Sequence, residues 1–509
     1  MTSPITLTRA PDAPPAAGEQ RLTAIEELDY LLDRPWEPNL VLWEIHTHGH
    51  LDREVLTDAV TTALGTDSGA RRRLAATPRW GRRLHWRSAP SPGGPGPRLG
   101  SSPGGPVPGG PGSSPLTVAS WRAPAELDAL RQRLFAWPIA LEEAVVRVVL
   151  AVGPEHDAVI MQVHHTAFDG ISSLRLLGAL AQAYRDRLGS PSGPHPVPDP
   201  PSKAQAVTPS SPTAPGMRET AAPESPKSTA VTPAAPDPAT PQAVPSLVTR
   251  AQAPSWPGTV TRIAPQAGRP DMPGYGFVLI SDTVTRPAAR SGGPRPTVND
   301  LLVAALCLTI DRWNAAHDQT SGQISVTIPV NGRTADQRWQ GDGNRSWLIR
   351  VITTPAQRAS ADVLLTAVAT QTRAARERGR TRTDALSRLL ATAWAPVSVK
   401  RRTARLIRDL AAPVLTDTSL VSNLGVLPEP PTFDGSGTEP LWLAPPGPMP
   451  RGLSVGAVTV AGRLYLSVRY RLALMDQAAA EDFTACFQAA MAELARSARP
   501  PGTDSRAPS

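Results

Sequence analysis

Residues 164–170 read HHTAFDG, which fits the pattern HHxxxDG. The chain has nine histidines in 509 residues, so an adjacent pair followed at fixed offsets by Asp and Gly is a rare combination. An imidazole at the end of a strand, with a carboxylate four residues on, can serve as a general base while the carboxylate orders its loop. The segment therefore predicts proton-transfer chemistry.

The elements on either side place this segment at a strand-to-helix junction. Residues 158–163 form an apolar run typical of a strand, and a helical pattern begins near Ser172. Since successive side chains of a strand point to opposite faces, His164 and His165 should point in opposite directions. Only one of them can then face a substrate, and we interpret the other as structural.

Composition divides the chain into two folded regions. Pro, Gly and Ser fill residues 88–115, and Pro, Ala, Ser and Thr fill residues 189–256, so neither stretch can bury enough apolar surface to fold. We expect these parts: a disordered N-terminus at 1–20, a first lobe at 21–188 with the insertion at 88–115, a disordered linker at 189–256, a second lobe at 257–497 and a disordered tail at 498–509.

Hydrophobic periodicity predicts an α/β protein. Apolar residues at helical spacing indicate helices at 23–34, 51–64, 172–184, 301–313, 361–375 and 476–496. Alternating or β-branched runs indicate strands at 41–45, 143–152, 158–163, 275–280, 324–330, 347–353, 420–424, 453–460 and 464–470. Thr297 offers a cap for the helix that follows it.

The net charge of +8 and a pI near 10.1 favour an acidic partner: nucleic acid, an anionic coenzyme or an acidic carrier protein. No zinc-finger or RNA-binding motif accompanies the arginines, so we expect no nucleic acid, and we interpret the basic runs 373–382 and 400–408 as solvated faces. We expect Cys307 and Cys486 to be buried free thiols. The chain shows no signal peptide or apolar span, which predicts a cytoplasmic protein without a membrane partner.

Two further patterns point to other chemistry. Residues 452–456 read GLSVG, which fits the hydrolase pattern GxSxG, but that fold needs a helix after the serine and a later histidine, and the last histidine is His317. His46, His48 and His50 alternate and would share one face of a strand. With no cysteine nearby we expect a solvated strand end there and no metal.

Several motifs together resemble the condensation-domain superfamily of thioester-dependent acyltransferases. This group includes nonribosomal-peptide condensation domains, polyketide-associated acyltransferases and chloramphenicol acetyltransferase. The resemblance runs from about Leu22 to Ala495, and its motifs are ELDY at 27–30, GHLD at 49–52, HHTAFDG at 164–170, TVNDLL at 297–302, PVNGR at 329–333, GDGN at 341–344, SNLG at 422–425 and GLSVG at 452–456.

The resemblance implies a fold and a reaction. The fold would be two chloramphenicol-acetyltransferase-like α+β sandwich lobes in a V-shaped pseudodimer, with the signature at the cleft between them. The donor would be a phosphopantetheine thioester, carried by an acyl or peptidyl carrier protein or by coenzyme A, as a co-substrate with no bound cofactor. The acceptor would be a small amine or alcohol, so the product could be an amide or an ester.

The resemblance also implies residue roles. His165 matches the catalytic second histidine, and with an ordinary pKa near 6.5 it would be mostly neutral and ready to take a proton. His164 would be structural, and Asp169 would pair with an arginine, for which Arg333 is the candidate; the alternative for Asp169 is a helix-end carboxylate favoured by the dipole. Gly170 would give the backbone freedom to turn, and its N–H could face an oxyanion. Asn344, Ser422 and Asn423 could line the cleft; the alternative for Asn344 and Ser422 is that they only hydrogen-bond the backbone.

No adenylation or carrier region accompanies these motifs, so we expect a standalone, monomeric acyltransferase of natural-product biosynthesis. The alternative is a non-catalytic docking module that recruits carrier proteins or partner enzymes. The complete signature favours the enzyme.

Overall fold

The structure is a computed structural model that describes residues 19–89, 115–189, 260–269, 272–283, 295–334, 339, 343–378, 392 and 395–497. The predicted tail and nearly all of the predicted N-terminus, insertion and linker lie outside these residues. At the borders of these segments, a few residues that we expected to be unstructured belong to strands or helices. Glu19 and Gln20 belong to strand β1 (Glu19–Arg21), because β4 supplies antiparallel backbone partners for them. Ser88 ends β4, and Gly189 ends α4.

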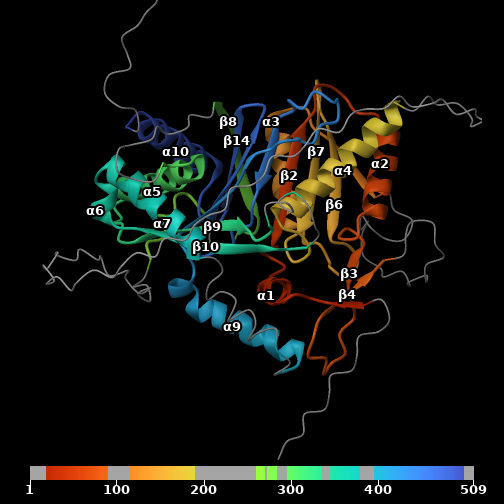
Figure 1. The fold of residues 1–509 in the computed structure, drawn as a ribbon, viewed down its shortest axis with the longest axis horizontal. Coiled ribbons are helices and arrows are strands. Elements are labelled where there is room, and N and C mark those ends of the chain that lie inside the picture. Colours follow the sequence, from red (N-terminus) through yellow and green to blue (C-terminus); the bar gives the residue numbers. More distant parts are fainter. Residues whose placement is uncertain are drawn as a thin grey trace, which may run out of the picture. The chain divides into compact units, whose positions relative to one another are not determined.

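The first sheet carries the signature. Its strand order is β12-β2-β7-β6-β5, with β12 at Leu441–Ala444, β2 at Leu40–His46, β7 at Asp157–His164, β6 at Val146–Val152 and β5 at Leu116–Ser120. Helices α2 (Arg53–Thr66) and α4 (Gly170–Gly189) pack beside each other against it (Figure 1). Every residue of β7 is buried, which explains its almost continuous apolar sequence.

The second sheet lies in the C-terminal half of the chain. Its strand order is β10-β9-β11-β13-β14-β8, with β10 at Ser346–Thr353, β9 at Ile324–Asn331, β11 at Ser419–Val426, β13 at Leu453–Val460, β14 at Arg463–Arg471 and β8 at Tyr275–Thr283. Helices α5 (Val298–Ala316), α7 (Ala361–Arg378) and α10 (Gln477–Ser497) cover it. Thr297 and Asp300 form the cap of α5 that the sequence predicts.

The remaining elements are short or lack a strong apolar period. A small sheet of order β1-β4-β3 contains β3 (Arg72–Leu74) and β4 (His85–Ser88). The helices are α1 (Ala24–Leu32), α3 (Pro124–Ala136), α6 (Pro355–Arg358) and α9 (Val397–Leu415). Of these, only α1 and the basic start of α9 were evident from the sequence.

The two sheets share structure across the predicted lobe boundary. Strand β12, from the C-terminal half, pairs antiparallel with β2 in the first sheet. Arg469 of β14 is buried between the rings of Phe135 and Tyr275 and donates to the carbonyl of Leu40 at 2.9 Å. The division at residues 188 and 257 therefore does not coincide with the sheets, because long-range pairing recruits a strand that local sequence cannot assign.

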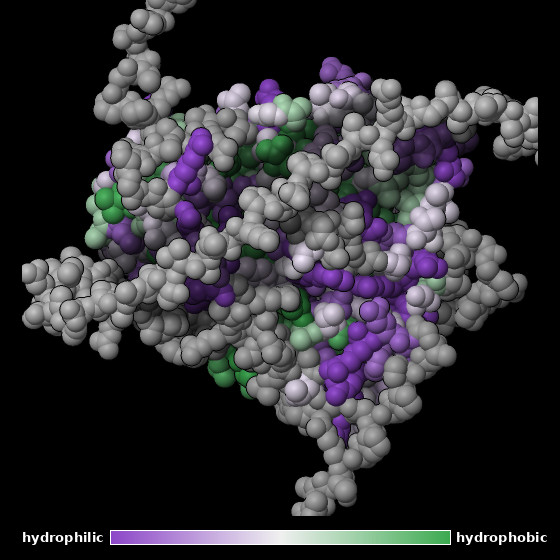
Figure 2. Space-filling model, in the orientation of Figure 1, coloured by the Kyte–Doolittle hydropathy of each residue, from purple (hydrophilic) through white to green (hydrophobic). Residues whose placement is uncertain are grey.

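Helix α9 packs its basic side against α1. Arg405 and Arg408 donate to the carbonyls of Asp33 and Leu32, at the C-terminal end of α1, where the helix dipole favours cations. The run 400–408 is therefore largely an internal contact and not the solvated face that we expected. The outward side of α9 carries exposed apolar side chains, and Figure 2 shows hydrophobic atoms where this helix lies.

These sheets and helices confirm the α/β prediction. Both sheets mix parallel and antiparallel neighbours, with β5–β6 parallel in the first and β9–β11–β13 parallel in the second. Among the described residues, no helix combines the length and the apolar character needed to cross a bilayer.

Candidate active site

The signature forms a tight turn between β7 and α4. His164 is the last residue of β7, and its carbonyl accepts the N–H groups of Ala167 and Phe168 at 2.9 and 3.2 Å. The N–H of His165 is bonded to the carbonyl of Asn39, next to β2, at 2.8 Å. The turn is thus fixed to two adjacent strand ends, and α4 begins at Gly170.

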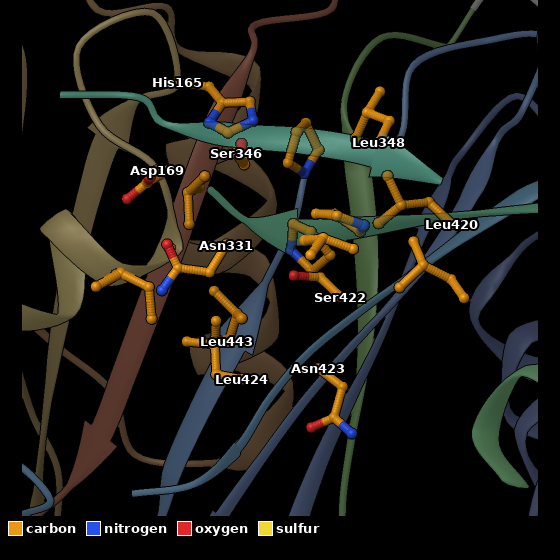
Figure 3. A pocket seen from close by; sticks show the side chains of 18 of the residues that line it. His165, Asp169, Asn331, Ser346, Leu348, Leu420, Ser422, Asn423, Leu424 and Leu443 are labelled. Carbon is orange, nitrogen blue, oxygen red and sulfur yellow. The ribbon is translucent and has the colours of Figure 1, made fainter. Parts of the chain in front are cut away.

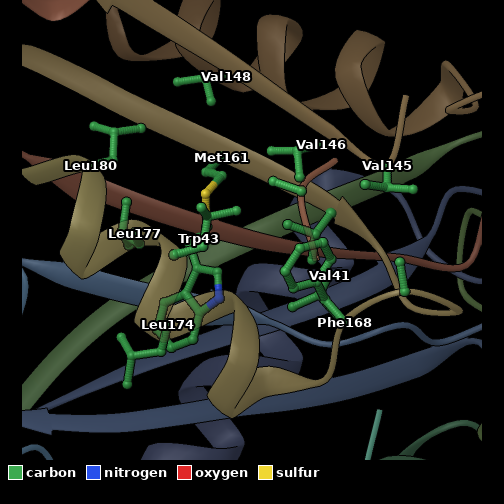
Figure 4. Close-up of a cluster of buried hydrophobic side chains, with 14 of the residues drawn as sticks. Val41, Trp43, Val145, Val146, Val148, Met161, Phe168, Leu174, Leu177 and Leu180 are labelled. Atoms are coloured by element: carbon green, nitrogen blue, oxygen red, sulfur yellow. The ribbon is translucent and has the colours of Figure 1, made fainter. Parts of the chain in front are cut away.

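A cluster of buried hydrophobic side chains anchors this turn (Figure 4). Phe168 is fully buried, and it lies with Val41, Trp43 and Leu174 among the apolar side chains between the first sheet and α4. The indole of Trp43 also donates to Ser173 Oγ in α4 at 2.8 Å. Phe168 is one of the variable positions of the signature, and its role as an anchor comes from packing.

The ring of His165 is oriented by one hydrogen bond. Its Nδ1 lies 2.9 Å from the carbonyl oxygen of Phe168. Since a carbonyl can only accept, Nδ1 carries the proton in the neutral ring, and Nε2 is left with the lone pair. His165 lines a cavity (Figure 3), so this geometry presents a proton acceptor to whatever enters it.

His164 lies away from that cavity and is buried. Its Nδ1 accepts the N–H of Thr166 at 3.2 Å, and its Nε2 lies 3.6 Å from Asp33 Oδ2. Burial alone would raise the pKa of Asp33, but the hydrogen bond and charge of His164, with the N–H of Asn39, outweigh it and lower that pKa. Both ring nitrogens of His164 are therefore engaged in holding the fold.

The two carboxylate oxygens of Asp169 accept hydrogen bonds from three residues. Oδ2 accepts Arg333 Nη1 at 2.6 Å and the N–H of Arg345 at 3.0 Å, while Oδ1 accepts the N–H of Ser172 at 2.8 Å. The arginine pair and the helix-end carboxylate, which the sequence left as alternatives, are both present. Because the side chains of Asp169 and Arg333 are both nearly fully buried, we interpret Asp169 as a structural residue.

Of the two roles expected for Gly170, the structure does not require the first, which is conformational freedom in the turn. Gly170 is the first residue of α4 and is not among the positive-φ glycines of the described chain, so the turn does not need its conformational freedom. Instead, a Cβ at this position would lie 3.3 Å from Leu424 Cδ2. Glycine therefore allows β11 to approach α4 closely at the cavity wall.

The cavity has a volume of about 1180 Å³ and is lined by residues from both halves of the chain. His165 and Asp169 come from the first sheet's turn, while Ser422, Asn423 and Leu424 come from the end of β11 (Figure 3). There the pairing of β11 with β13 shifts register, since Asn423 Oδ1 accepts the N–H of Gly425 at 2.8 Å. This irregular strand end forms the wall where Ser422 and Asn423 were expected.

Of the two alternatives for Asn344, the structure agrees with the second: it does not line the cavity, and it hydrogen-bonds a backbone carbonyl. It is buried, and its Nδ2 donates to Asp29 Oδ2 at 2.9 Å and to the carbonyl of His165 at 3.3 Å. Its Oδ1 accepts the N–H and hydroxyl of Ser346. Both the nitrogen and the oxygen of its side-chain amide are bonded to protein groups, so Asn344 supports the turn that carries His165.

Asp29 of α1 is a site residue that the sequence analysis missed. It lines the cavity beside His165, and burial raises its pKa to about 6 despite lowering by His165, His164 and the Asn344 hydrogen bond. A signal was present in the sequence: Asp29 follows Ile25 by four residues and precedes Leu32 by three, which places an acid on the apolar face of the helix.

The rival motifs lead elsewhere. Ser454, the serine of the GxSxG pattern, lies inside β13, is fully buried and donates to the carbonyl of Pro445. His46, His48 and His50 contact three different carboxylates, and no cluster able to hold a metal occurs in the part of the chain that the structure describes.

The two cysteines differ from each other. Cys307 is buried, as expected, and burial raises the pKa of its thiol to about 11. Cys486 is exposed on α10, because the apolar period of that helix leaves position 486 on the solvent side.

Comparison with solved structures identifies the fold. The first condensation domain of the CDA synthetase superposes with a TM-score of 0.57 at 15% identity, over 94% of this chain and 96% of that one. The starter condensation domain of rhizomide synthetase, a mutant in complex with C8-CoA, gives 0.55 at 12% identity, over 94% and 95%. The chain has the condensation-domain fold.

Sequence comparison adds relatives without a known activity. Two uncharacterized proteins of Mycobacterium tuberculosis, Rv2305 of strain H37Rv and MT2362 of strain CDC 1551, are each 27% identical over 323 residues. The match spans 62% of this chain and 62% of each relative. No model of a known protein family matches the chain. The condensation fold therefore rests on the structure, and the reaction has to be argued from the site.

Proposed function

We propose that this chain is an acyltransferase of the condensation type, which moves an acyl group from a phosphopantetheine thioester to an amine or hydroxyl. The observation that supports this most is the His165 ring, held through Nδ1 with Nε2 unprotonated at the wall of a large cavity. A C8-CoA complex of the rhizomide synthetase domain, which shares the fold, agrees with such a donor.

The reaction needs one base and no covalent enzyme intermediate. His165 Nε2 takes the proton of the acceptor while the acceptor's nitrogen or oxygen bonds to the thioester carbonyl carbon. The tetrahedral intermediate then collapses, the carbon–sulfur bond breaks, and the proton passes to sulfur. The N–H of Gly170 opens α4, where helix amides lack internal partners, and is the donor that we propose for the oxyanion.

The cavity has room for both substrates. A volume of about 1180 Å³ exceeds that of most single-ligand pockets, which are roughly 300–1,000 Å³. Its lining joins apolar side chains such as Leu348 and Leu424 to polar ones such as Ser422 and Asn423. Such a lining suits an acyl chain beside a polar pantetheine arm or acceptor.

The test is to mix the chain with acyl-CoA or acyl carrier protein and a panel of amines and alcohols, and to follow the intact mass of the donor. We expect loss of acyl mass from one donor only when the matching acceptor is present, and no loss with His165→Ala. Turnover that survives in His165→Ala would exclude His165 as the base. The docking module would be favoured if cells that carry this protein formed its product only in the presence of the folded chain but formed it equally well with His165→Ala.

A further inference from the structure

Among the described residues, four carboxylates line the cavity, and one of them differs from the rest. Asp33, Glu37 and Asp169 each have a basic side-chain partner, respectively His164 at 3.6 Å, Arg408 at 3.4 Å and Arg333 at 2.6 Å. Asp29 is the fourth, and among the described residues it has no arginine or lysine partner. A partly buried carboxylate without an arginine or lysine partner is costly, which suggests a use for it.

The contacts of Asp29 lead to His165. Asn344 Nδ2 donates to Asp29 Oδ2 at 2.9 Å and to the His165 carbonyl at 3.3 Å, so one amide joins the carboxylate to the histidine turn. In the described part of the chain, no group donates to Asp29 Oδ1. The ionisable groups that act on Asp29 are His165 and His164, which attract its charge, and Glu26, which repels it.

We propose that Asp29 is the electrostatic partner of His165, whose carboxylate stabilises the positive charge that the imidazole gains when it takes the acceptor's proton. Asp169 cannot do this, because its oxygens are occupied by Arg333, Arg345 and Ser172. The inference rests on the proposed function. Asp29 acts through His165, so it is a positioning residue, and at a partly buried position its attraction for the imidazolium is stronger than it would be in bulk water.

Steady-state kinetics test the role. Asp29→Asn keeps the shape and can keep the Asn344 bond, and we expect it to lower kcat about tenfold or more, with KM changed less than about twofold. Asp29→Glu should recover part of that loss. Asp58→Asn removes an exposed carboxylate and serves as the charge control, with unchanged kcat. A loss confined to KM would overturn the proposal in favour of direct acceptor binding, and an unchanged kcat would also overturn it.

The pH profile gives a readout that a merely structural role would not change. Because the pKa of Asp29 is raised to about 6, kcat of the natural chain should fall as the pH drops below that value and Asp29 becomes protonated. Protonation of His165 removes the base in both proteins, so Asp29→Asn should also lose kcat at low pH, but with a lower midpoint, because no carboxylate attracts the imidazolium. A decline of equal size and midpoint in both proteins would contradict the proposal.

A spectroscopic measurement separates this inference from the proposed function. With ¹³C-labelled aspartate, the Asp29 carboxyl signal, assigned by its loss in Asp29→Asn, should titrate near pH 6. In His165→Ala its midpoint should move upward, because the attraction of the imidazolium is gone. An unchanged midpoint would overturn the pairing even if acyl transfer is established. If no donor is turned over, the proposed function fails, and this titration still decides whether the two residues are coupled.

Discussion

Arg333 Nη1 donates to Asp169 Oδ2 at 2.6 Å although 164 positions separate the two residues, and this bond ties the end of β9 to the turn that carries His165. Their side chains are 1% and 4% exposed. Together with the bonds from the Arg345 N–H to Asp169 and from Asn344 to the His165 carbonyl, this buried ion pair joins the turn to the second sheet, so fold stability and the geometry of the candidate site are connected.

Replacing Asp169 should destabilise the chain strongly. Asp169→Asn leaves the Arg333 guanidinium buried without its counter-charge, at a cost of about 3–5 kcal/mol in the free energy of unfolding. Urea denaturation measures this cost. The matched control is Glu377→Gln, which breaks an exposed pair with Arg373 and should change stability by less than about 0.5 kcal/mol. Similar small losses in both variants would show that the buried pair is not a structural tie.

Replacing His165 should remove turnover and leave the fold intact. His165→Ala deletes the proton acceptor, so we expect kcat to fall by about 10²–10⁴-fold. Among the described residues, the one side-chain bond lost is that from Nδ1 to the carbonyl of Phe168, and Phe168 itself stays anchored by packing. The melting temperature should therefore change little. A large drop in it would instead assign His165 a structural function.

Replacing Asp29 should stabilise the chain in a pH-dependent way. The folded pKa of about 6 lies above the ordinary value of 3.8, so between those values the folded chain keeps a proton that the unfolded chain has lost. The contribution of Asp29 to stability therefore falls as the pH rises through that window. Asp29→Asn should be more stable than the natural chain by about 1–2 kcal/mol near pH 7, with no gain near pH 4. Thermal unfolding at several pH values measures this, and a gain that is independent of pH would contradict it.

Gly170 offers a test of the cavity wall. Gly170→Ala places a Cβ 3.3 Å from Leu424 Cδ2, which should push that side chain into the cavity and shift the preferred acyl donor or acceptor to a smaller one. Adding Leu424→Ala should reverse the shift. Gly178→Ala, in the same helix with open space around it, should stabilise by about 0.5–1 kcal/mol and leave kcat/KM unchanged across a series of substrates. An unaltered substrate range in Gly170→Ala would refute this.

The attachment of α9 depends on a second buried pair. Lys400 and Glu27 form a hydrogen-bonded ion pair between α9 and α1 in which neither side chain is exposed. Lys400→Met leaves the carboxylate of Glu27 buried alone and should cost about 3–5 kcal/mol in urea denaturation. Replacing both by methionine should recover much of the loss, because no unpaired charge then remains. If the double variant is as unstable as the single one, packing and not charge holds α9.

The sequence by itself determined the local features. The apolar run before His164 predicts β7, the helical pattern that begins near Ser172 predicts α4, and Thr297 with Asp300 predicts the cap of α5. These features depend on neighbours within a few positions, where periodicity and capping chemistry are sufficient. The pairing of Asp169 with Arg333 was also expected, through a resemblance that carries long-range information no local pattern holds.

Only the tertiary structure decided what surrounds the catalytic candidate. It brings Asp29 of α1 to the His165 turn, turns Asn344 away from the cavity, and places β12 in the first sheet, although none of these has a local signature that fixes its neighbours. A side chain's charge partner and burial depend on segments hundreds of positions away. The environment that can give Asp29 an acid–base role therefore arises only when α1, the histidine turn and β10 are packed together.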